Sequence, residues 1–191
     1  MPADLPILVF RDQKTWAAWL TKNHGKSSGV WLRMAKKASG LPSVSHSEAL
    51  NVALCYGWID GQARSADENT WVQKFIPRAK KSIWSKINRQ KALALIEAGQ
   101  MRPAGLAEIE RAKKDGRWEA AYDSPRGATV PDDLQAALDG NARAKAFFTT
   151  LNGQNRYAIL FRIQTTKKAD TRSRKIQQFV DMLARGEKLH P

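Results

Sequence analysis

A single acidic side chain lies among tryptophans near the middle of the chain, and it is the first candidate for ligand chemistry. Residues 57–65 read GWIDGQARS, so Asp60 follows Trp58 by two positions and Gln62 follows Asp60 by two more. In a β-strand these three side chains lie on one face, because side chains alternate across a strand. A carboxylate beside an indole ring is typical of a ligand pocket, whose walls are mostly apolar with a few polar groups.

Two further strand-like segments extend this candidate pocket. Residues 29–36 and 70–76 also alternate, and each carries a tryptophan. The candidate pocket therefore consists of Trp31, Arg33, Trp58, Asp60, Gln62 and Trp71. The structural alternative is that a helix carrying Trp84 and Ile87 covers this face, and that an arginine or a backbone group satisfies a buried Asp60.

A run of basic residues is the second candidate. No Asp or Glu occurs between Asn69 and Ile96. The candidate anion-binding residues in this run are Arg78, Lys80, Lys81, Lys86 and Arg89. We expect them at or near the start of a helix, where free backbone N–H groups favour anions. Neighbouring aromatic residues would allow nucleobases to stack, although a charge run is also typical of a solvated face.

The composition agrees with an anionic partner. The 191 residues carry a formal net charge of +14, which attracts nucleic acid, phosphate-bearing ligands and anionic lipid. No signature of a common RNA-binding module or of a zinc finger is present in the sequence. The single Cys55 excludes an intramolecular disulfide, and its apolar surroundings predict a buried thiol.

Signatures of catalysis are sparse. The sequence contains no P-loop, no GxSxG, no HExxH and no Rossmann glycine motif, and its three histidines have no obvious nucleophile beside them. We therefore expect a protein that is not an enzyme, with no cofactor and no metal site. The first residues resemble neither a signal peptide nor a membrane span, so the expected location is the cytoplasm.

Local signals predict the elements of an α+β fold with a small antiparallel sheet packed against helices. Asp12 and Ser82 are predicted N-caps, and Ser45 with Glu48 has the spacing of a capping box. Gly57 is expected to end a helix in the left-handed conformation. A turn at residues 67–69 predicts a hairpin. The first apolar run, LPILVF, predicts a short additional strand.

The chain is expected to contain two domains. Residues 123–131 hold two prolines and a glycine without an apolar period, which predicts a linker. The α+β domain then spans residues 1–122, and residues 132–191 form an all-helical appendage.

Several longer segments resemble the YdeI/OmpD-associated proteins, also called bacteriocin-protection proteins. These segments are GVWLRMAKKASGLPSVSHSEAL, ALCYGWIDGQARS, WSKIN, GQMRPAGLAEIERAKKDGRWEAAY and the tail that begins NRYAILFRIQTTKKADTRSRKIQQF. The resemblance covers nearly the whole chain. It implies a link to envelope stress and to protection against antimicrobial peptides in association with a porin, and it supplies no catalytic or metal-binding residue.

Together these observations predict a soluble, non-enzymatic binding protein whose partner is nucleic acid or another polyanion. The alternative is a small-molecule binder or an enzyme that uses the tryptophan-lined face around Asp60. The sequence leaves the oligomeric state open.

Overall fold

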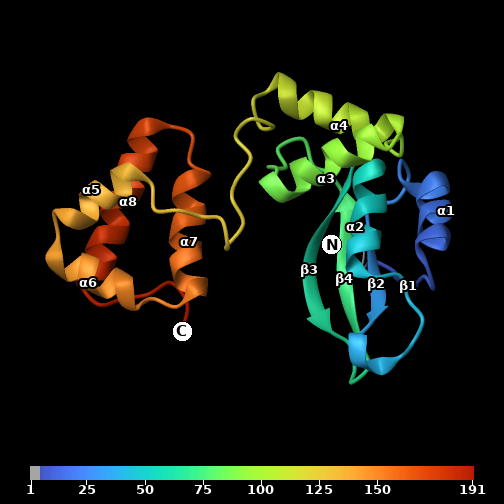
Figure 1. The fold of residues 1–191 in the computed structure, drawn as a ribbon, viewed down its shortest axis with the longest axis horizontal. Helices are drawn as coiled ribbons and strands as arrows, with labels where there is room; N and C mark the ends of the chain where they lie inside the picture. Colours follow the sequence, from blue (N-terminus) through green and yellow to red (C-terminus); the bar gives the residue numbers. More distant parts are fainter. Residues whose placement is uncertain (1–4) are drawn as a thin grey trace. The chain divides into compact units, whose positions relative to one another are not determined.

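The computed structural model describes residues 5–191, which fold as two compact units. The first unit runs to Trp84 and includes Asn88–Glu119, and the second comprises Ser85–Ile87 and Ala120–Pro191. The first unit contains a sheet and helices, and the second is helical (Figure 1). The α+β class expected from the sequence is confirmed. The linker expected at residues 123–131 stays a prediction.

A four-stranded sheet organises the first unit. Its strands are β1 (Ile7–Val9), β2 (Val30–Ala35), β3 (Trp58–Ser65) and β4 (Thr70–Pro77), in the order β1-β2-β4-β3. The pairs β2–β4 and β3–β4 are antiparallel, but β1 is parallel to β2. The expected antiparallel pairings are present, but the parallel β1 makes the sheet mixed rather than the antiparallel sheet that the sequence predicted. The helix between β1 and β2 makes this parallel pairing possible, because parallel neighbours need a long crossover.

The register of the strands corrects the expected distribution of the tryptophans. Trp71 lies opposite Met34, and Asp60 lies opposite Phe75, so these side chains share one face. Trp31 lies opposite Lys74 and faces the other way. Trp31 and Arg33 therefore do not share a face with Trp58, Asp60 and Trp71. Alternation gives two sets of side chains for each strand, but only the cross-strand partner shows which sets belong together.

Two helices, α1 (Gln13–Asn23) and α2 (His46–Cys55), cover the first face of the sheet. The ring of Trp16 on α1 lies 5.8 Å from Phe75 and 6.3 Å from Trp58, measured between ring centroids. The Trp16 Nε1–H group also donates to the carbonyl of Ala49 on α2, at 3.1 Å. We call the side of the sheet under α1 and α2 the covered face. The expectation that a helix carrying Trp84 and Ile87 would cover it was wrong.

Local caps fix the ends of both helices as predicted. The Asp12 carboxylate accepts from the Thr15 N–H at 2.8 Å, and Ser45 with Glu48 forms the reciprocal capping box. Gly57 has φ 73°, the left-handed value expected after α2. Its N–H group donates to the carbonyl of Leu54.

The helices α3 (Lys86–Glu97) and α4 (Pro103–Lys114) follow the sheet, and a 3-10 turn (Lys37–Ser39) follows β2. Ser82 does not cap α3, because the helix begins four residues later and the Ser82 hydroxyl accepts from the Ala79 N–H instead. Helix α4 approaches the end of α2 closely at Gly105. A Cβ atom there would lie 2.4 Å from the Cys55 carbonyl oxygen, so this contact requires glycine.

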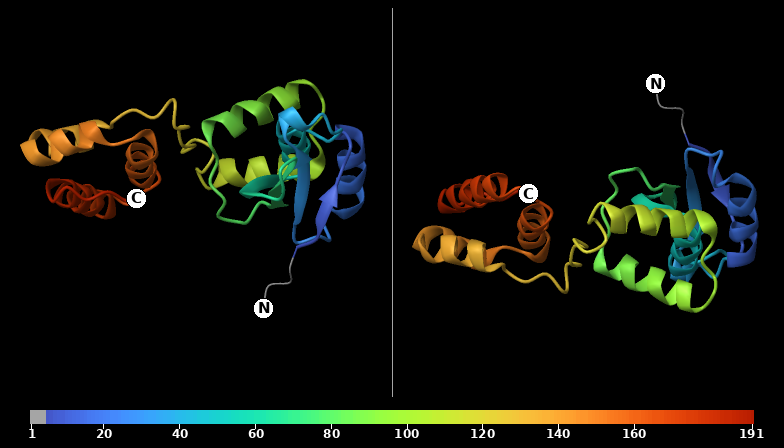
Figure 2. Two further views of the ribbon diagram at one scale, coloured as in Figure 1. Left: turned by 90° about the horizontal axis from the view of Figure 1, so that it is seen from below. Right: turned by 90° about the horizontal axis from the view of Figure 1, so that it is seen from above.

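The second unit packs four helices around its own apolar core (Figure 2). They are α5 (Asp132–Asp139), α6 (Ala142–Thr150), α7 (Gly153–Gln164) and α8 (Ala169–Ala184), as the sequence predicted. Arg172 on α8 binds both carboxylate oxygens of Asp133 and donates to the Ile163 carbonyl, which ties three helices together. Within residues 5–191, no helix is both long and apolar enough to cross a membrane.

Candidate anion-binding face and the Asp60 cleft

The side of the sheet opposite α1 and α2, here called the open face, carries a tryptophan under two cations. The ring of Trp31 on β2 is partly exposed. The Arg64 guanidinium of β3 lies 4.5 Å from its centroid, and the Lys74 ammonium of β4 lies 5.9 Å away. Both distances suit attraction between a cation and the face of an indole. Three strands thus bring one aromatic ring and two positive charges together on an accessible surface.

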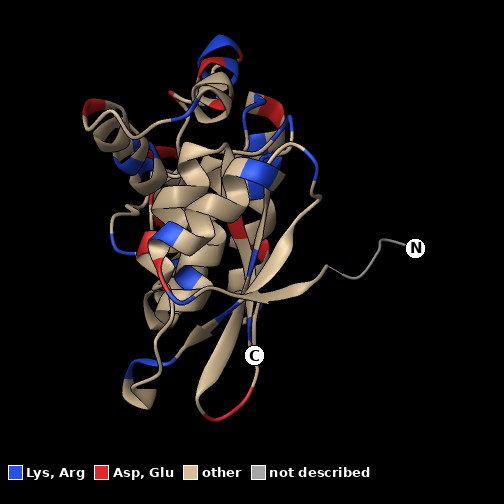
Figure 3. Ribbon diagram, turned by 90° about the vertical axis from the view of Figure 1, so that its right-hand side faces the viewer, with Lys and Arg blue, Asp and Glu red and all other residues tan. Residues whose placement is uncertain are grey.

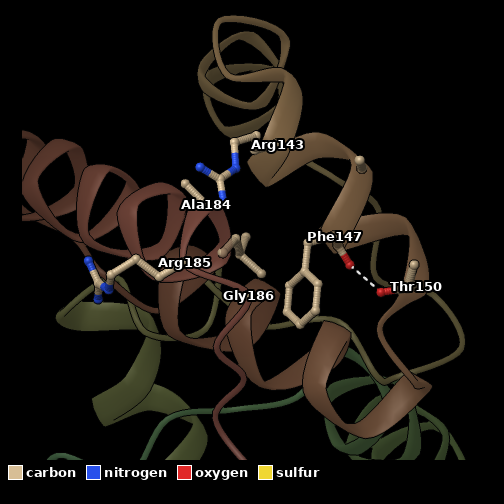
Figure 4. A pocket seen from close by; sticks show the side chains of 8 residues that line it. Arg143, Phe147, Thr150, Ala184, Arg185 and Gly186 are labelled. Carbon is tan, nitrogen blue, oxygen red and sulfur yellow. Dashed lines mark hydrogen bonds between the residues drawn. The ribbon is translucent and has the colours of Figure 1, made fainter.

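Arg33 adds a third cation to the open face. Its side chain is 42% exposed, and its Nη1 atom lies 3.8 Å from the Asp67 carboxylate in the β3–β4 turn. The Thr70 hydroxyl, with the N–H groups of Asn69 and Thr70, hydrogen-bonds to Asp67 and holds the pKa of that carboxyl below its usual range. The turn that holds this acid is the red hairpin tip in Figure 3, and its contact with Arg33 is long, so the exposed end of the Arg33 side chain can approach another acceptor.

A cleft of about 560 Å³ continues the open face beyond Lys74. Its lining includes Lys74, Ile76, Arg78 and Ala79. Gly29 permits the close packing behind it, because a Cβ atom there would lie 2.6 Å from the Ile76 side chain. The cleft leads from the cations around the indole ring to the basic loop that follows β4.

Three arginines, of which Arg78 and Arg117 are buried, hold this loop, residues 78–83, in place. The Arg78 guanidinium stacks 3.6 Å from the Trp84 ring centroid and donates to the carbonyl of Ile83. Arg111 donates to the Ala79 carbonyl at 3.2 Å, and Arg117 donates to the Ser82 carbonyl at 2.6 Å. Anchored at both ends, the loop leaves the side chains of Lys80 and Lys81 exposed.

Acidic partners balance part of this arginine charge. Glu108 pairs with Arg111, and Asp115 binds the Arg117 guanidinium at 2.8 Å. Burial raises the pKa of Glu108, while the neighbouring Arg111 opposes that shift. The guanidinium groups of Arg111 and Arg117 therefore serve the structure of the loop.

The structure places the five predicted anion-binding residues in different settings. Arg78 is buried against Trp84, and Arg89 donates to the carbonyl of Trp118 at 3.1 Å. Lys86 belongs to the second unit, where its ammonium lies 2.7 Å from Asp123. Lys86 is exposed as well, so Lys80 and Lys81 are the exposed members within the first unit. The sequence reasoning missed Arg64 and Lys74, whose proximity to Trp31 depends on the register of β2, β3 and β4.

Asp60 has a partner on the covered face that the sequence did not reveal. Its Oδ2 atom lies 3.0 Å from Nε2 of His46, the first residue of α2. The His46 ring also lies 6.0 Å from Trp71 and 6.4 Å from Phe75. Asp60 therefore pairs with a histidine rather than with an arginine or a backbone cap. The one sequence signal for this position is the capping box, which predicts that α2 begins at His46.

The other predicted pocket residues do not form a single pocket around Asp60. Trp58 is buried among core aromatic rings, and its Nε1–H group donates to the His24 carbonyl. Gln62 is exposed at an irregularity of β3, where its carbonyl accepts from the Gln73 side chain. Trp71 lines a cleft of about 470 Å³ together with His46.

Groups suited to metal binding or thiol chemistry are not evident in this region. Across residues 5–191, no cluster of three or more His, Cys, Asp or Glu side chains could hold a metal ion. The Cys55 thiol is buried as predicted, and burial raises its pKa. A thiol in that setting is a poor nucleophile.

The fold and the surfaces define a two-part protein: an α+β unit with a basic, aromatic sheet face, and a helical unit. Residues 8–108, more than half of the chain, match the family model described as "Domain of unknown function (DUF8412)", and the chain belongs to that family. Residues 127–186 match the model "Bacteriocin-protection, YdeI or OmpD-Associated". The predicted resemblance is confirmed for this part of the chain, and its expected extent over nearly the whole chain was too wide. No curated protein and no solved structure matches the chain.

Proposed function

We propose that the first unit binds single-stranded nucleic acid across the open face of its sheet. The observation that carries this proposal is the position of Trp31 beneath Arg64 and Lys74 on the side of the sheet away from α1 and α2. A partly exposed indole such as Trp31 can offer a stacking surface to any base, and guanidinium and ammonium groups neutralise phosphates.

The arrangement favours a single strand over a duplex. Bases in a duplex are stacked on one another and cannot reach a flat indole, whereas an unpaired base can. Lys74 also lines the cleft that leads to the basic loop, so a strand that leaves Trp31 can pass toward Lys80 and Lys81. The exposed cations along this path provide successive phosphate contacts.

The charge of the whole chain supports an anionic partner. At +14 the protein attracts polyanions from a distance and repels cationic peptides. Any part in bacteriocin protection, which the name of the C-terminal family suggests, would therefore not rest on direct capture of such peptides by charge. A nucleic-acid ligand also agrees with the cytoplasmic location that we infer from the sequence.

Binding of a labelled oligothymidine of about 20 nucleotides, followed by fluorescence anisotropy over a salt series, tests the proposal. The double variant Arg64→Gln/Lys74→Gln removes two charges beside Trp31. The double variant Lys113→Gln/Lys114→Gln removes two charges from exposed positions on α4 and serves as the matched control. Both variants have the same net charge, so a difference between their affinities shows that the position of the removed charges matters.

We expect the open-face variant to bind at least about tenfold more weakly and to lower the salt slope by about 1.4, the value for two phosphates on a single strand. The α4 variant should bind nearly as the parent protein does. Equal losses in the two variants would show that net charge alone drives binding, and no binding by the parent protein at about 50 mM salt would overturn the proposal.

A further inference from the structure

The cleft beside His46 is a second concave site, and it lies on the covered side of the sheet. Trp71 and Met34, which line it, are cross-strand neighbours on the face opposite Trp31. The start of α2 and the segment after β2 complete its walls. Its volume of about 470 Å³ falls within the usual range for small-molecule sites.

The pairing with Asp60 gives His46 a defined chemistry. When Nε2 donates to the carboxylate, the other ring nitrogen, Nδ1, carries a lone pair and accepts a hydrogen bond. His46 lines the cleft, whereas Asp60 does not. The histidine thus presents the cleft with a polar group whose tautomer the carboxylate behind it fixes.

Other polar groups around the cleft are committed to the protein. The Ser43 hydroxyl accepts from the Ala35 N–H and donates to the Val44 carbonyl, and the Ser45 hydroxyl belongs to the capping box. The Lys36 ammonium donates to the Asp67 carbonyl at 2.8 Å.

Lys37 and Trp71 supply the remaining recognition elements. Lys37 lines the cleft and is exposed. Trp71 is partly exposed and offers an aromatic wall. A ligand that satisfies both residues and His46 is flat, carries a negative charge and holds a hydrogen-bond donor away from that charge.

We propose that this cleft binds a small planar carboxylate that also carries a hydroxyl or amino donor. The carboxylate pairs with Lys37, the ring packs on Trp71, and the donor binds Nδ1 of His46. The proposal is independent of nucleic-acid binding, because Trp71 and His46 lie on the covered side of the sheet and the ligand is small.

Titration with 4-hydroxybenzoate, followed by the imidazole Cε1–H signals in NMR spectra, tests the proposal on the full chain. The protein has three histidines, and the variant His46→Gln assigns the signal of interest. We expect a saturable shift of the His46 signal, with the signals of His24 and His190 nearly unchanged. Benzoate, which lacks the donor, should bind about fivefold more weakly than 4-hydroxybenzoate.

The variant Lys37→Gln tests the charge contact, and Lys22→Gln, at an exposed position on α1, is its control. We expect Lys37→Gln to weaken 4-hydroxybenzoate binding about fivefold and to leave 4-hydroxybenzamide binding unchanged. No saturable shift of the His46 signal below about 10 mM ligand would overturn the proposal. Equal affinities for benzoate and 4-hydroxybenzoate, or equal effects of the two lysine variants, would also overturn it.

Discussion

The two faces of the sheet use the same kinds of side chain in opposite ways. On the covered face, Trp58 is buried against the rings of α1, and its Nε1–H group has a backbone acceptor. On the open face, the partly exposed indole of Trp31 lies under two long cationic side chains, Arg64 and Lys74. The comparison indicates that one face contributes stability and that the other is available for binding.

The largest expected effect is a loss of stability, and it should differ clearly between a tryptophan of the covered face and one of the open face. Trp58→Ala removes a fully buried ring and should lower the free energy of unfolding by about 3–5 kcal/mol, measured by urea denaturation. Trp31→Leu should cost much less, about 1 kcal/mol, because the ring is only partly buried, leucine keeps part of its apolar contact area, and the lost cation–π contacts are weak at an accessible site. Similar losses for both variants would mean that Trp31 is a core residue.

The pair of Asp60 and His46 is expected to make a smaller contribution to stability than the buried Trp58 ring. Its side chain is 26% exposed and that of its partner His46 is 40% exposed, so solvent screens the pair. We expect Asp60→Ala to lower the free energy of unfolding by about 1 kcal/mol or less. A loss above about 2 kcal/mol would show that the pair is a structural tie between α2 and β3 in an effectively buried setting.

A smaller effect is expected from the acid nearest the open face. Asp67→Asn removes the negative charge beside Arg33, and we expect oligothymidine to bind about twofold more tightly. The lowered pKa of Asp67 makes this carboxylate stabilising above its unfolded-state pKa, and that contribution is lost as pH falls through the folded-state pKa. The stability gap between Asp67→Asn and the parent protein should therefore narrow in acid, as urea denaturation at several pH values can show.

Much of the local structure was predictable because its causes are local. The caps at Asp12 and Ser45, the left-handed Gly57 and the four C-terminal helices each depend on residues within a few positions of one another. The start of α3 was not predictable in this way. Distant side chains, Arg111 and Arg117, hold the carbonyl groups of the preceding loop and keep Ser82 outside the helix.

The candidate sites depended on longer-range information. The face on which Trp31 lies follows from its pairing with Lys74, which is 43 residues away in the chain. The partner of Asp60 comes from a different element, the first turn of α2. Sequence reasoning therefore named the tryptophans, Asp60, Lys80 and Lys81 as candidates. It placed Trp31 on the wrong face, and its candidate sites did not include Arg64, Lys74 or His46.

The most direct test of the central claim is the ratio of affinities for oligothymidine and heparin in the Trp31→Leu variant. Both ligands are polyanions, but only the oligonucleotide has bases that can stack. We predict that oligothymidine binding weakens by about 1–3 kcal/mol while heparin binding changes little. Urea denaturation of the same variant should confirm that it is folded. Equal changes for the two ligands, or no change for oligothymidine, would contradict the assignment of the open face as a surface for single-stranded nucleic acid.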